Sequence, residues 1–393
     1  MSRAEHILTE LFASADVHCD GRRAWDIAVK DPRFFARTLA QGSLGFGESY
    51  MDGWWECAAI DAMVFRLIRA GVPSQVKTRL HAAAAWAASF LVNLQTRRRA
   101  TLVGRHHYDL GNDFFAAMLG PAMQYSCAWF HGTDDLDEAQ ARKLERLCRK
   151  LDLRPGMRLL DIGCGWGALA RHAAQHHGCR VVGITISDQQ ARYARDACRG
   201  LPVEIRLQDY RDVPDTFDRV ISVGMMEHVG PKNHRHFMAA ATGRLSNDGG
   251  IFLCHTIGNP SSRRWTDPWI ARHIFPNSLV PSPAQVMRAA DGLLVLEDAE
   301  NLGTHYDRTL VAWEHNVRAA WPRFRPRYGD RFLRMWRYYL LSCAGAFRAR
   351  DIQLYQFVFA KGGVAGGYTR PHLPAEAVEA NGHGDDAEIT LTP

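Results

Sequence analysis

The 393-residue sequence predicts an α/β fold in which a largely parallel sheet is flanked by helices and preceded by a mostly helical N-terminal domain. Two observations favour this fold. Five short apolar runs alternate with stretches of helical periodicity, an order that typically builds a parallel sheet. The first run ends in residues 159–167, Leu-Leu-Asp-Ile-Gly-Cys-Gly-Trp-Gly, where the glycines allow a strand to turn sharply into a helix.

This glycine-rich turn predicts a site for a nucleotide-like ligand. A helix is expected at 168–176, and its N-terminus, together with nearby backbone N–H groups, can approach such a ligand closely. Gly163, Gly165 and Gly167 follow Asp161 in a GxGxG spacing, not the GxGxxG of dinucleotide folds. The spacing resembles that of Rossmann-like class I S-adenosylmethionine-dependent methyltransferases. An NAD-binding turn and a purely structural turn are the alternatives.

Four further strands of the sheet are expected at 180–186, 203–208, 217–223 and 250–254. Ligands of such sheets bind beyond the carboxyl ends of the strands, where Asp209, Glu227 and His255 lie. At the end of the second strand the usual acidic ribose ligand is replaced by Thr185, so Gln190 is expected to reach the ribose hydroxyls. Asp209 and the neighbouring Tyr210 suit an adenine edge and an adenine face.

Around this sheet we expect an N-terminal domain at 1–95, a catalytic domain at 96–362 and a disordered tail at 363–393, where Gly, Pro and acidic residues dominate. A long insertion at 259–283 is expected to cover the substrate. The other expected features are a glycine-rich turn at 42–53 followed by packing tryptophans, helices at 80–94, 139–151 and 330–347, and a strand at 355–360.

Cysteine usage and charge restrict the class of protein. The nine cysteines show no CxxC pair, which argues against disulfides and a structural zinc site and favours the cytoplasm. The net charge is +6, from 48 basic and 42 acidic residues, but residues 62–108 hold eight Lys and Arg residues and no acid. Cations that bracket an apolar helix suit an anionic membrane surface. A core helix with solvated ends explains the pattern equally well, and no nucleic-acid motif accompanies it.

Eight motifs between Asp26 and Gly362 carry a resemblance to a known family. They are Gly-Glu-Ser-Tyr-Met-Asp-Gly-Trp-Trp (47–55), His-Tyr-Asp-Leu-Gly-Asn-Asp-Phe-Phe (107–115), Gln-Tyr-Ser-Cys (124–127), Asp-Ile-Gly-Cys-Gly-Trp-Gly (161–167), Glu-His-Val-Gly (227–230), His-Thr-Ile-Gly (255–258), Ile-Phe-Pro-Asn (274–277) and Cys-Ala-Gly-Ala-Phe-Arg (343–348). Together they resemble the bacterial cyclopropane-fatty-acyl-phospholipid synthases, and the chain is also similar to the mycolic acid cyclopropane synthases. The N-terminal domain favours the phospholipid branch.

The resemblance implies a reaction and the residues that perform it. S-adenosylmethionine would supply a methylene bridge across a cis double bond of a phospholipid acyl chain, through a carbocation. The implied cofactor-binding residues are Tyr125, Ser126, Asp161, Gly163, Gly165, Thr185, Gln190, Asp209 and Tyr210. A bound bicarbonate ion would act as the base, held by the backbone of Cys127 and Ile257 and by the side chains of Glu227, His255 and Tyr306. The family also implies a homodimer. We further expect the protein to associate peripherally with the inner face of the membrane and to hold no metal ion.

Several residues and rival functions stay open. Cys164 and Cys343 are expected to be packing thiols, with Cys343 kept as a candidate catalytic residue. The histidines expected at the surface are His106, His172, His176, His234 and His236. A methyltransferase that acts on another lipid or an amine without closing a ring would share the cofactor motifs. A non-catalytic lipid-binding protein is disfavoured by the intact glycine loop.

Overall fold

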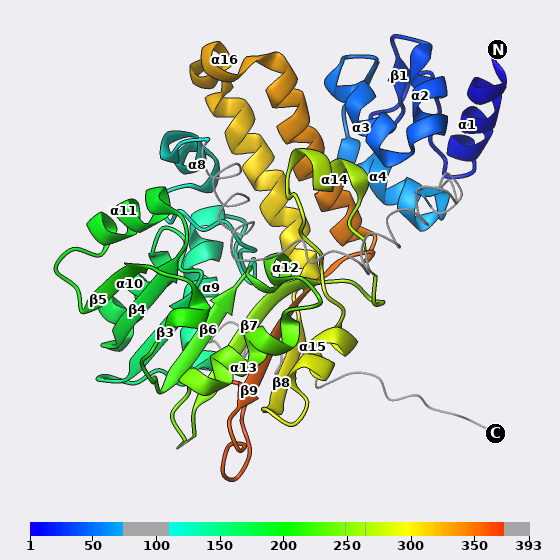
Figure 1. Ribbon diagram of the computed structural model, residues 1–393. Coiled ribbons are helices and arrows are strands. Elements are labelled where there is room, and N and C mark those ends of the chain that lie inside the picture. The colour runs from blue at the N-terminus through cyan, green and yellow to red at the C-terminus, as the bar shows by residue number, and fades with distance from the viewer. Residues whose placement is uncertain (74–109, 248, 264, 373–393) are drawn as a thin grey trace, which may run out of the picture.

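The computed structural model describes residues 1–73, 110–247, 249–263 and 265–372 (Figure 1). The N-terminal elements are α1 (Arg3–Ala13), β1 (Ala28–Val29), α2 (Arg33–Gln41), α3 (Ser43–Met51), β2 (Trp55–Glu56) and α4 (Ile60–Arg69). The elements up to the middle of the sheet are α8 (Asn112–Leu119), α9 (Leu136–Lys150), β3 (Arg158–Ile162), α10 (Ala168–His177), β4 (Arg180–Thr185), α11 (Asp188–Ala197), β5 (Val203–Leu207) and the 3₁₀ turn η1 (Tyr210–Asp212). The remaining elements are β6 (Arg219–Val223), α12 (Met226–Val229), α13 (His234–Arg244), β7 (Ile251–Gly258), α14 (Pro268–His273), α15 (Pro283–Ala290), β8 (Val295–Asn301), α16 (Gly303–Arg348) and β9 (Gln353–Ala360).

The central sheet confirms the predicted α/β architecture. Its seven strands follow the order β5-β4-β3-β6-β7-β9-β8. The five strands from β5 to β7 are parallel, whereas β9 pairs antiparallel with both β7 and β8. The strand order reverses between β4 and β6, on either side of β3, so the crevice beyond the carboxyl end of β3 is the place where a ligand is expected.

One hydrophobic core joins the N-terminal helices to the sheet through α16. Phe34 and Trp55 from the N-terminal part belong to the same buried cluster as Phe114 of α8 and Trp313 and Trp336 of α16. Figure 1 shows α16 as two antiparallel arms between the N-terminal helices and the sheet. The arms meet at Gly329, whose φ of 72° breaks the helical geometry.

The segment 42–53 is a correction to the sequence analysis, because it forms helix α3 instead of a turn. Its glycines permit close packing. A Cβ on Gly45 would lie 2.4 Å from the carbonyl oxygen of Arg37, and one on Gly47 would lie 2.5 Å from the indole of Trp269. Trp55 is fully buried, as expected of a packing residue.

The C-terminal part also differs from expectation. The first arm of α16 and the edge strand β8 were not predicted, and β7 continues through His255 to Gly258. The predicted disordered tail begins too early, because residues 363–372 pack on the sheet. Val364 N–H donates to Glu297 (2.7 Å), and the Tyr368 hydroxyl donates to the carbonyl of Lys150 (2.9 Å).

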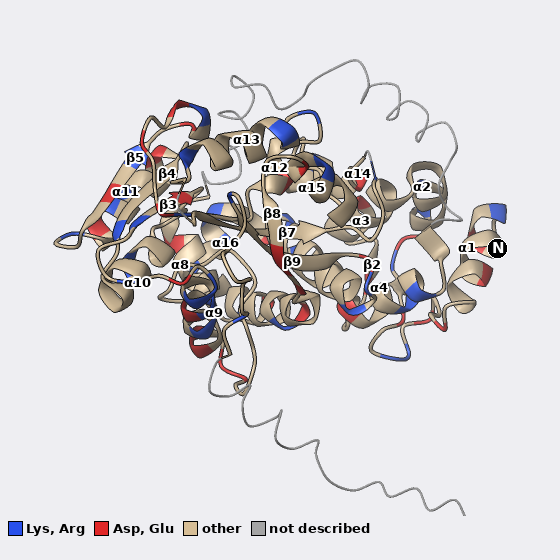
Figure 2. Cartoon of the chain, turned by 90° about the horizontal axis from the view of Figure 1, so that it is seen from below, with Lys and Arg blue, Asp and Glu red and all other residues tan. Residues whose placement is uncertain are grey.

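Charges on the described helices are largely matched locally. Acidic and basic residues are interspersed along α9 and α11 (Figure 2), with i,i+4 pairs such as Arg142–Glu138 and Arg192–Asp188, both at 2.7–2.8 Å. The predicted helix 80–94 and most of the basic segment 62–108 lie outside the described residues. Within the described residues, no helix combines the length and hydropathy needed to cross a bilayer.

Candidate cofactor and active site

A cavity of about 210 Å³ opens at the carboxyl ends of the parallel strands. The structure brings all nine predicted cofactor residues to its wall. They are Tyr125, Ser126, Asp161, Gly163, Gly165, Thr185, Gln190, Asp209 and Tyr210. These residues come from the ends of β3, β4 and β5, from the first turn of α11 and from the segment before α9, so the sheet topology brings most of them together.

The glycine loop forms the floor of this cavity. Gly163 and Gly165 have φ values of 83° and 56°, in the left-handed region that L side chains rarely adopt. A Cβ on Gly165 would meet no protein atom within 4 Å, so the space above the loop is open to a ligand. Helix α10 begins directly after the loop at Ala168, which directs its N-terminal N–H groups toward the same space.

Thr185 fixes the orientation of the Gln190 side chain through a hydrogen bond. The buried Thr185 hydroxyl donates to the side-chain oxygen of Gln190 (2.9 Å) and accepts a hydrogen bond from the N–H of Ser187 (3.2 Å). With its oxygen held by Thr185, Gln190 has an NH₂ group to offer to the cavity that both residues line. Gln190 is therefore a polar group that lines the cavity near the end of β4, where Thr185 stands in place of an acidic residue.

Asp209 is held in place by an arginine. Its carboxylate caps η1 by accepting from the N–H of Arg211 (3.0 Å), and it pairs with the guanidinium of the same residue (2.7 Å). Arg211 also lies 5.2 Å over the ring of Tyr210, which packs edge-on against Phe237 at 5.3 Å. Both predicted adenine contacts are therefore oriented before any ligand binds.

A buried lysine lies behind the part of the cavity wall that Gln124 and Ser126 form. Lys143 of α9 donates to the Ser126 hydroxyl (2.9 Å) and to the side chain of Gln124. Burial lowers the pKa of Lys143 to about 7. Burial also raises the pKa of Asp161 to about 7, opposed by the charge of Lys143. Sequence analysis did not identify Lys143, since a lysine in a predicted helix is expected at the surface.

The predicted catalytic residues do not line the cavity, but Glu227 and His255 lie buried next to it. Glu227 lies between the cavity residues Met225 and His228, and the carbonyl of His255 accepts from the N–H of Gly224, which also lines the cavity (2.9 Å). Both side chains are buried. Glu227 Oε2 and His255 Nε2 have no hydrogen-bond partner among the described residues. Buried polar atoms usually have a hydrogen-bond partner, so these two atoms are candidates for contact with a bound small molecule or ion.

The protonation states of this group follow from its burial. Burial raises the pKa of Glu227 to about 7, so its carboxyl is partly protonated at neutral pH. Burial lowers the pKa of His255 to about 3, which keeps the imidazole neutral. The side-chain NH₂ of Gln356, opposite His255 in the β7–β9 register, lies 3.2 Å from its Nδ1. Donation there leaves the imidazole proton on Nε2, the atom without a partner.

Tyr306 joins this group from the first arm of α16. Burial raises the pKa of its hydroxyl well above 10, and the nearby Cys127, Tyr125 and Glu227 act in the same direction. The hydroxyl is thus a neutral hydrogen-bond donor. Its ring packs on Phe347 at 4.6 Å.

The three remaining predicted residues have less direct roles. The Ile257 N–H donates to Glu227 Oε1 (2.6 Å), so in this structure it orients the carboxyl and does not face a free anion site. Cys127 is buried beside Thr309, which lies 3.9 Å from its sulfur. Burial raises the pKa values of Cys127 and Cys343 to about 12, so neither thiol is a ready nucleophile.

Residues outside the predicted set complete the cavity. The insertion after β7 contributes Phe275, Pro276 and Asn277 to its wall, consistent with the expected cover over the substrate. The Tyr125 hydroxyl lies 3.0 Å from that of Tyr339, and its ring lies 5.3 Å from Trp313. Trp313 lies in the first arm of α16, which was not predicted, whereas Tyr339 lies in the helix predicted at 330–347 but was not assigned to the site.

The histidine predictions need a correction. His234 is buried and His172 is partly buried, contrary to the surface positions expected, whereas His176 and His236 are exposed. His106 lies outside the described residues.

Comparisons with known proteins identify the family of the chain. A family model described as mycolic acid cyclopropane synthetase matches residues 95–357. The chain is 50% identical over 356 residues to the cyclopropane-fatty-acyl-phospholipid synthase of Escherichia coli (strain K12), covering 91% of this chain and 93% of that protein.

Two solved structures are also similar. The cyclopropane synthase MmaA2 from Mycobacterium tuberculosis superposes with a TM-score of 0.64 at 31% identity, covering 69% of this chain and 100% of that one. The mycolic acid cyclopropane synthase CmaA1, complexed with SAH and CTAB, gives a TM-score of 0.63 at 30% identity, covering 66% and 98%.

Proposed function

The chain belongs to the mycolic acid cyclopropane synthetase family, and on that premise we propose that it forms cyclopropane rings on unsaturated acyl chains of phospholipids, with S-adenosylmethionine as the methylene donor. The observation that carries the proposal is the cofactor cavity, whose wall adjoins the buried polar group of Glu227, His255 and Tyr306. A cofactor cavity next to a buried polar group suits a reaction that consumes a bound methyl donor and then removes a proton in a site shielded from water.

The residues of the cavity fit the donor. Its open glycine floor, the NH₂ group of Gln190 and the fixed carboxylate of Asp209 supply the contacts that an adenosine moiety needs. The donor supplies an electrophilic methyl group. An isolated alkene is a weak nucleophile, so the enzyme gains rate mainly by holding the double bond against that methyl in a dry site.

Aromatic side chains can stabilise the carbocation that forms after methyl transfer. When the alkene electrons form the new carbon–carbon bond, the sulfonium leaves as a thioether and the second alkene carbon becomes a carbocation. Tyr125, with Trp313 at 5.3 Å and the hydroxyl of Tyr339 at 3.0 Å, presents π faces and no carboxylate that the cation could alkylate. Loss of one proton from the transferred carbon then closes the ring.

The buried polar group fits a small anion at this step. The protonated fraction of Glu227, the Nε2–H of His255 and the Tyr306 hydroxyl are neutral donors, and two of these atoms have no partner among the described residues. Bicarbonate held there supplies a replaceable proton acceptor. Ile257 positions the Glu227 carboxyl, and Gln356 fixes the tautomer of His255.

Analysis of the product tests the proposed reaction. The chain is expressed in a host that lacks such an enzyme, and its phospholipids are examined by mass spectrometry and proton NMR. We expect the mass gain of one methylene group, loss of the alkene signal and appearance of cyclopropane protons. A methyl branch of the same mass would instead indicate transfer without ring closure, and unchanged lipids would indicate a binding protein.

A separate experiment tests the anion. A general base typically contributes 10²–10⁴-fold in rate. Glu227→Ala, His255→Ala and Tyr306→Phe should lower turnover by that order while leaving affinity for S-adenosylhomocysteine nearly unchanged. Activity should fall when dissolved carbonate is removed and return with bicarbonate but not with chloride. Cys127→Ala serves as the milder control, because its backbone N–H is retained. Full activity in carbonate-free buffer would exclude the assignment.

The lipid substrate also implies where the enzyme works. We propose that it binds the inner face of the membrane peripherally, through the basic segment 62–108, and that it acts as a homodimer. Sedimentation with anionic vesicles tests the first statement, and light scattering of the full chain tests the second.

A further inference from the structure

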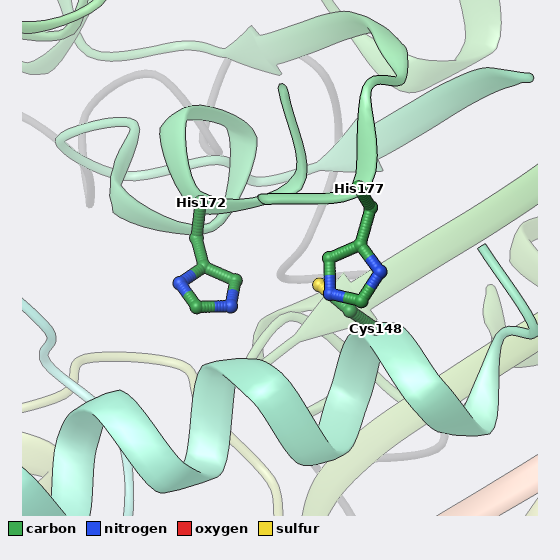
Figure 3. A group of neighbouring side chains, drawn as sticks. All are labelled: Cys148, His172 and His177. Atoms are coloured by element: carbon green, nitrogen blue, oxygen red, sulfur yellow. The ribbon is translucent and has the colours of Figure 1, made fainter. Parts of the chain in front are cut away.

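Three side chains with metal-binding atoms gather outside the cofactor cavity, where α9 packs against α10. One atom each from Cys148, His172 and His177 lies within 4.8 Å of the other two. Figure 3 shows both imidazole rings projecting toward α9, with the sulfur of Cys148 beside the ring of His177. Sequence spacing could not indicate this group, because the cysteine and the histidines come from different helices.

A carboxylate completes the group. Glu145 precedes Cys148 by one turn of α9, and its Oε2 lies 3.2 Å from His172 Nε2 and 3.1 Å from His177 Nε2. Its other oxygen accepts from Arg149 (2.6 Å). One carboxylate oxygen thus contacts both imidazoles. Figure 3 places nitrogen atoms on the facing edges of the two rings. The distances from Glu145 Oε2 to both Nε2 atoms add the carboxylate to the same small volume.

We propose that Cys148, His172 and His177 bind a divalent transition-metal ion, best satisfied by Zn²⁺, with Glu145 as the fourth ligand. Thiolate and imidazole select zinc over magnesium or calcium, which require oxygen ligands. Zinc bond lengths of about 2.0–2.3 Å place tetrahedral ligand atoms roughly 3.3–3.6 Å apart. The observed atoms lie within 4.8 Å of one another, so the group is wider than an ideal zinc site by at most about 1.5 Å, a difference that side-chain rotation covers.

The competing explanation is a metal-free polar network in which Glu145 binds two histidines beside an inert core thiol. Burial keeps the Cys148 thiol protonated when no metal is present, by raising its pKa well above the usual value. A zinc ion would convert this network into a clamp between α9 and α10. Helix α9 carries Lys143, bonded to Ser126 in the cavity, and α10 starts at the glycine loop, so the clamp would brace both walls of the cofactor site.

Metal binding by the full-length chain, freed of metal with a chelator, tests the proposal. We expect one equivalent of Zn²⁺ to be captured in competition with a chromophoric chelator and to raise the melting temperature. Co²⁺ should give the visible bands of a tetrahedral site and a near-ultraviolet thiolate-to-cobalt absorption. Cys148→Ser should abolish that absorption, and His177→Gln should weaken zinc binding at least ten-fold.

His236→Gln is the matched control, since this exposed histidine belongs to α13 and not to the group, and it should leave all readouts unchanged. Melting of the metal-free variants establishes that each one folds. If Cys148→Ser does not fold, His172→Gln replaces it, with the same ten-fold loss expected. Zinc affinity equal in wild type and His177→Gln, or a cobalt complex without thiolate absorption, would establish the metal-free network instead.

Discussion

Replacement of Thr185 by valine tests how the cofactor site works without an acidic residue at the end of β4. The two side chains have similar shapes, so the change removes little except the hydroxyl. That hydroxyl donates to Gln190 (2.9 Å) and accepts from the N–H of Ser187 (3.2 Å). Thr185→Ser, which keeps the hydroxyl, is the matched control.

The size of the effect follows from the groups left without a partner. A buried polar group that loses its hydrogen bond costs about 1–3 kcal/mol. In Thr185→Val the amide of Gln190 can turn toward the cavity when no ligand is bound. The loss of folding stability should therefore lie at the low end of this range, about 1 kcal/mol. On binding, the amide must be held again without support. A loss of about 1–1.4 kcal/mol corresponds to about five- to ten-fold weaker cofactor binding.

Calorimetry with S-adenosylhomocysteine measures the effect, and a double-mutant cycle with Gln190→Ala assigns it. If Thr185 acts through Gln190, Thr185→Val should change affinity by less than about two-fold once Gln190 is absent. An equally large loss in the Gln190→Ala background would mean that Thr185 contacts the cofactor itself. Unchanged affinity in the single variant would refute the supporting role altogether.

Three further predictions concern the glycine floor, the buried carboxyl and the basic segment. Gly165→Val should abolish binding of S-adenosylhomocysteine in calorimetry, because its φ of 56° disfavours a branched side chain and the new atoms would enter the ligand space. Burial raises the pKa of Glu227 from 4.5 to about 7, so between these values the native state binds the extra proton and stability falls as pH rises. The free energy of unfolding of Glu227→Gln, measured with urea relative to wild type, should therefore rise by up to about 3 kcal/mol between pH ~4.5 and pH ~8. A difference that stays constant over this range would contradict the raised pKa. Replacing Arg97, Arg98 and Arg99 together by Gln should weaken binding to anionic vesicles by about 1 kcal/mol per residue, whereas unchanged, salt-insensitive binding would favour a core helix.

The sequence was most informative where function depends on local chain geometry. The glycine turn, Thr185 and the residues after the third strand all follow directly from strand ends, and the sheet topology brings them to one cavity. The family resemblance supplied Tyr125 and Ser126, which no local pattern connects to the sheet. Ser126 is held by Lys143, a buried lysine in a helix whose sequence is rich in charge.

Two kinds of feature could not be predicted. Glycines at 45 and 47 were assigned to a turn because glycine usually breaks helices. In the structure they lie in a helix, where the missing side chain lets a carbonyl oxygen and an indole of other elements approach closely. Only tertiary packing reveals that use. The pairing of His255 with Gln356 likewise depends on an antiparallel register between strands about a hundred residues apart, which no local periodicity encodes.

Helix α3 packs against the insertion that contributes Phe275 to the cavity wall. Trp269 of α14 is fully buried against Gly47, and His273 lies 3.1 Å from Glu48, so α3 holds both ends of this short helix. Two residues later, Phe275 lines the cavity and contacts His228 at 5.6 Å. The family match begins at residue 95, so α3 lies outside the matched region. A change in α3 can therefore alter the cavity wall without touching the cofactor residues, because the wall is attached to α3 and not only to the sheet.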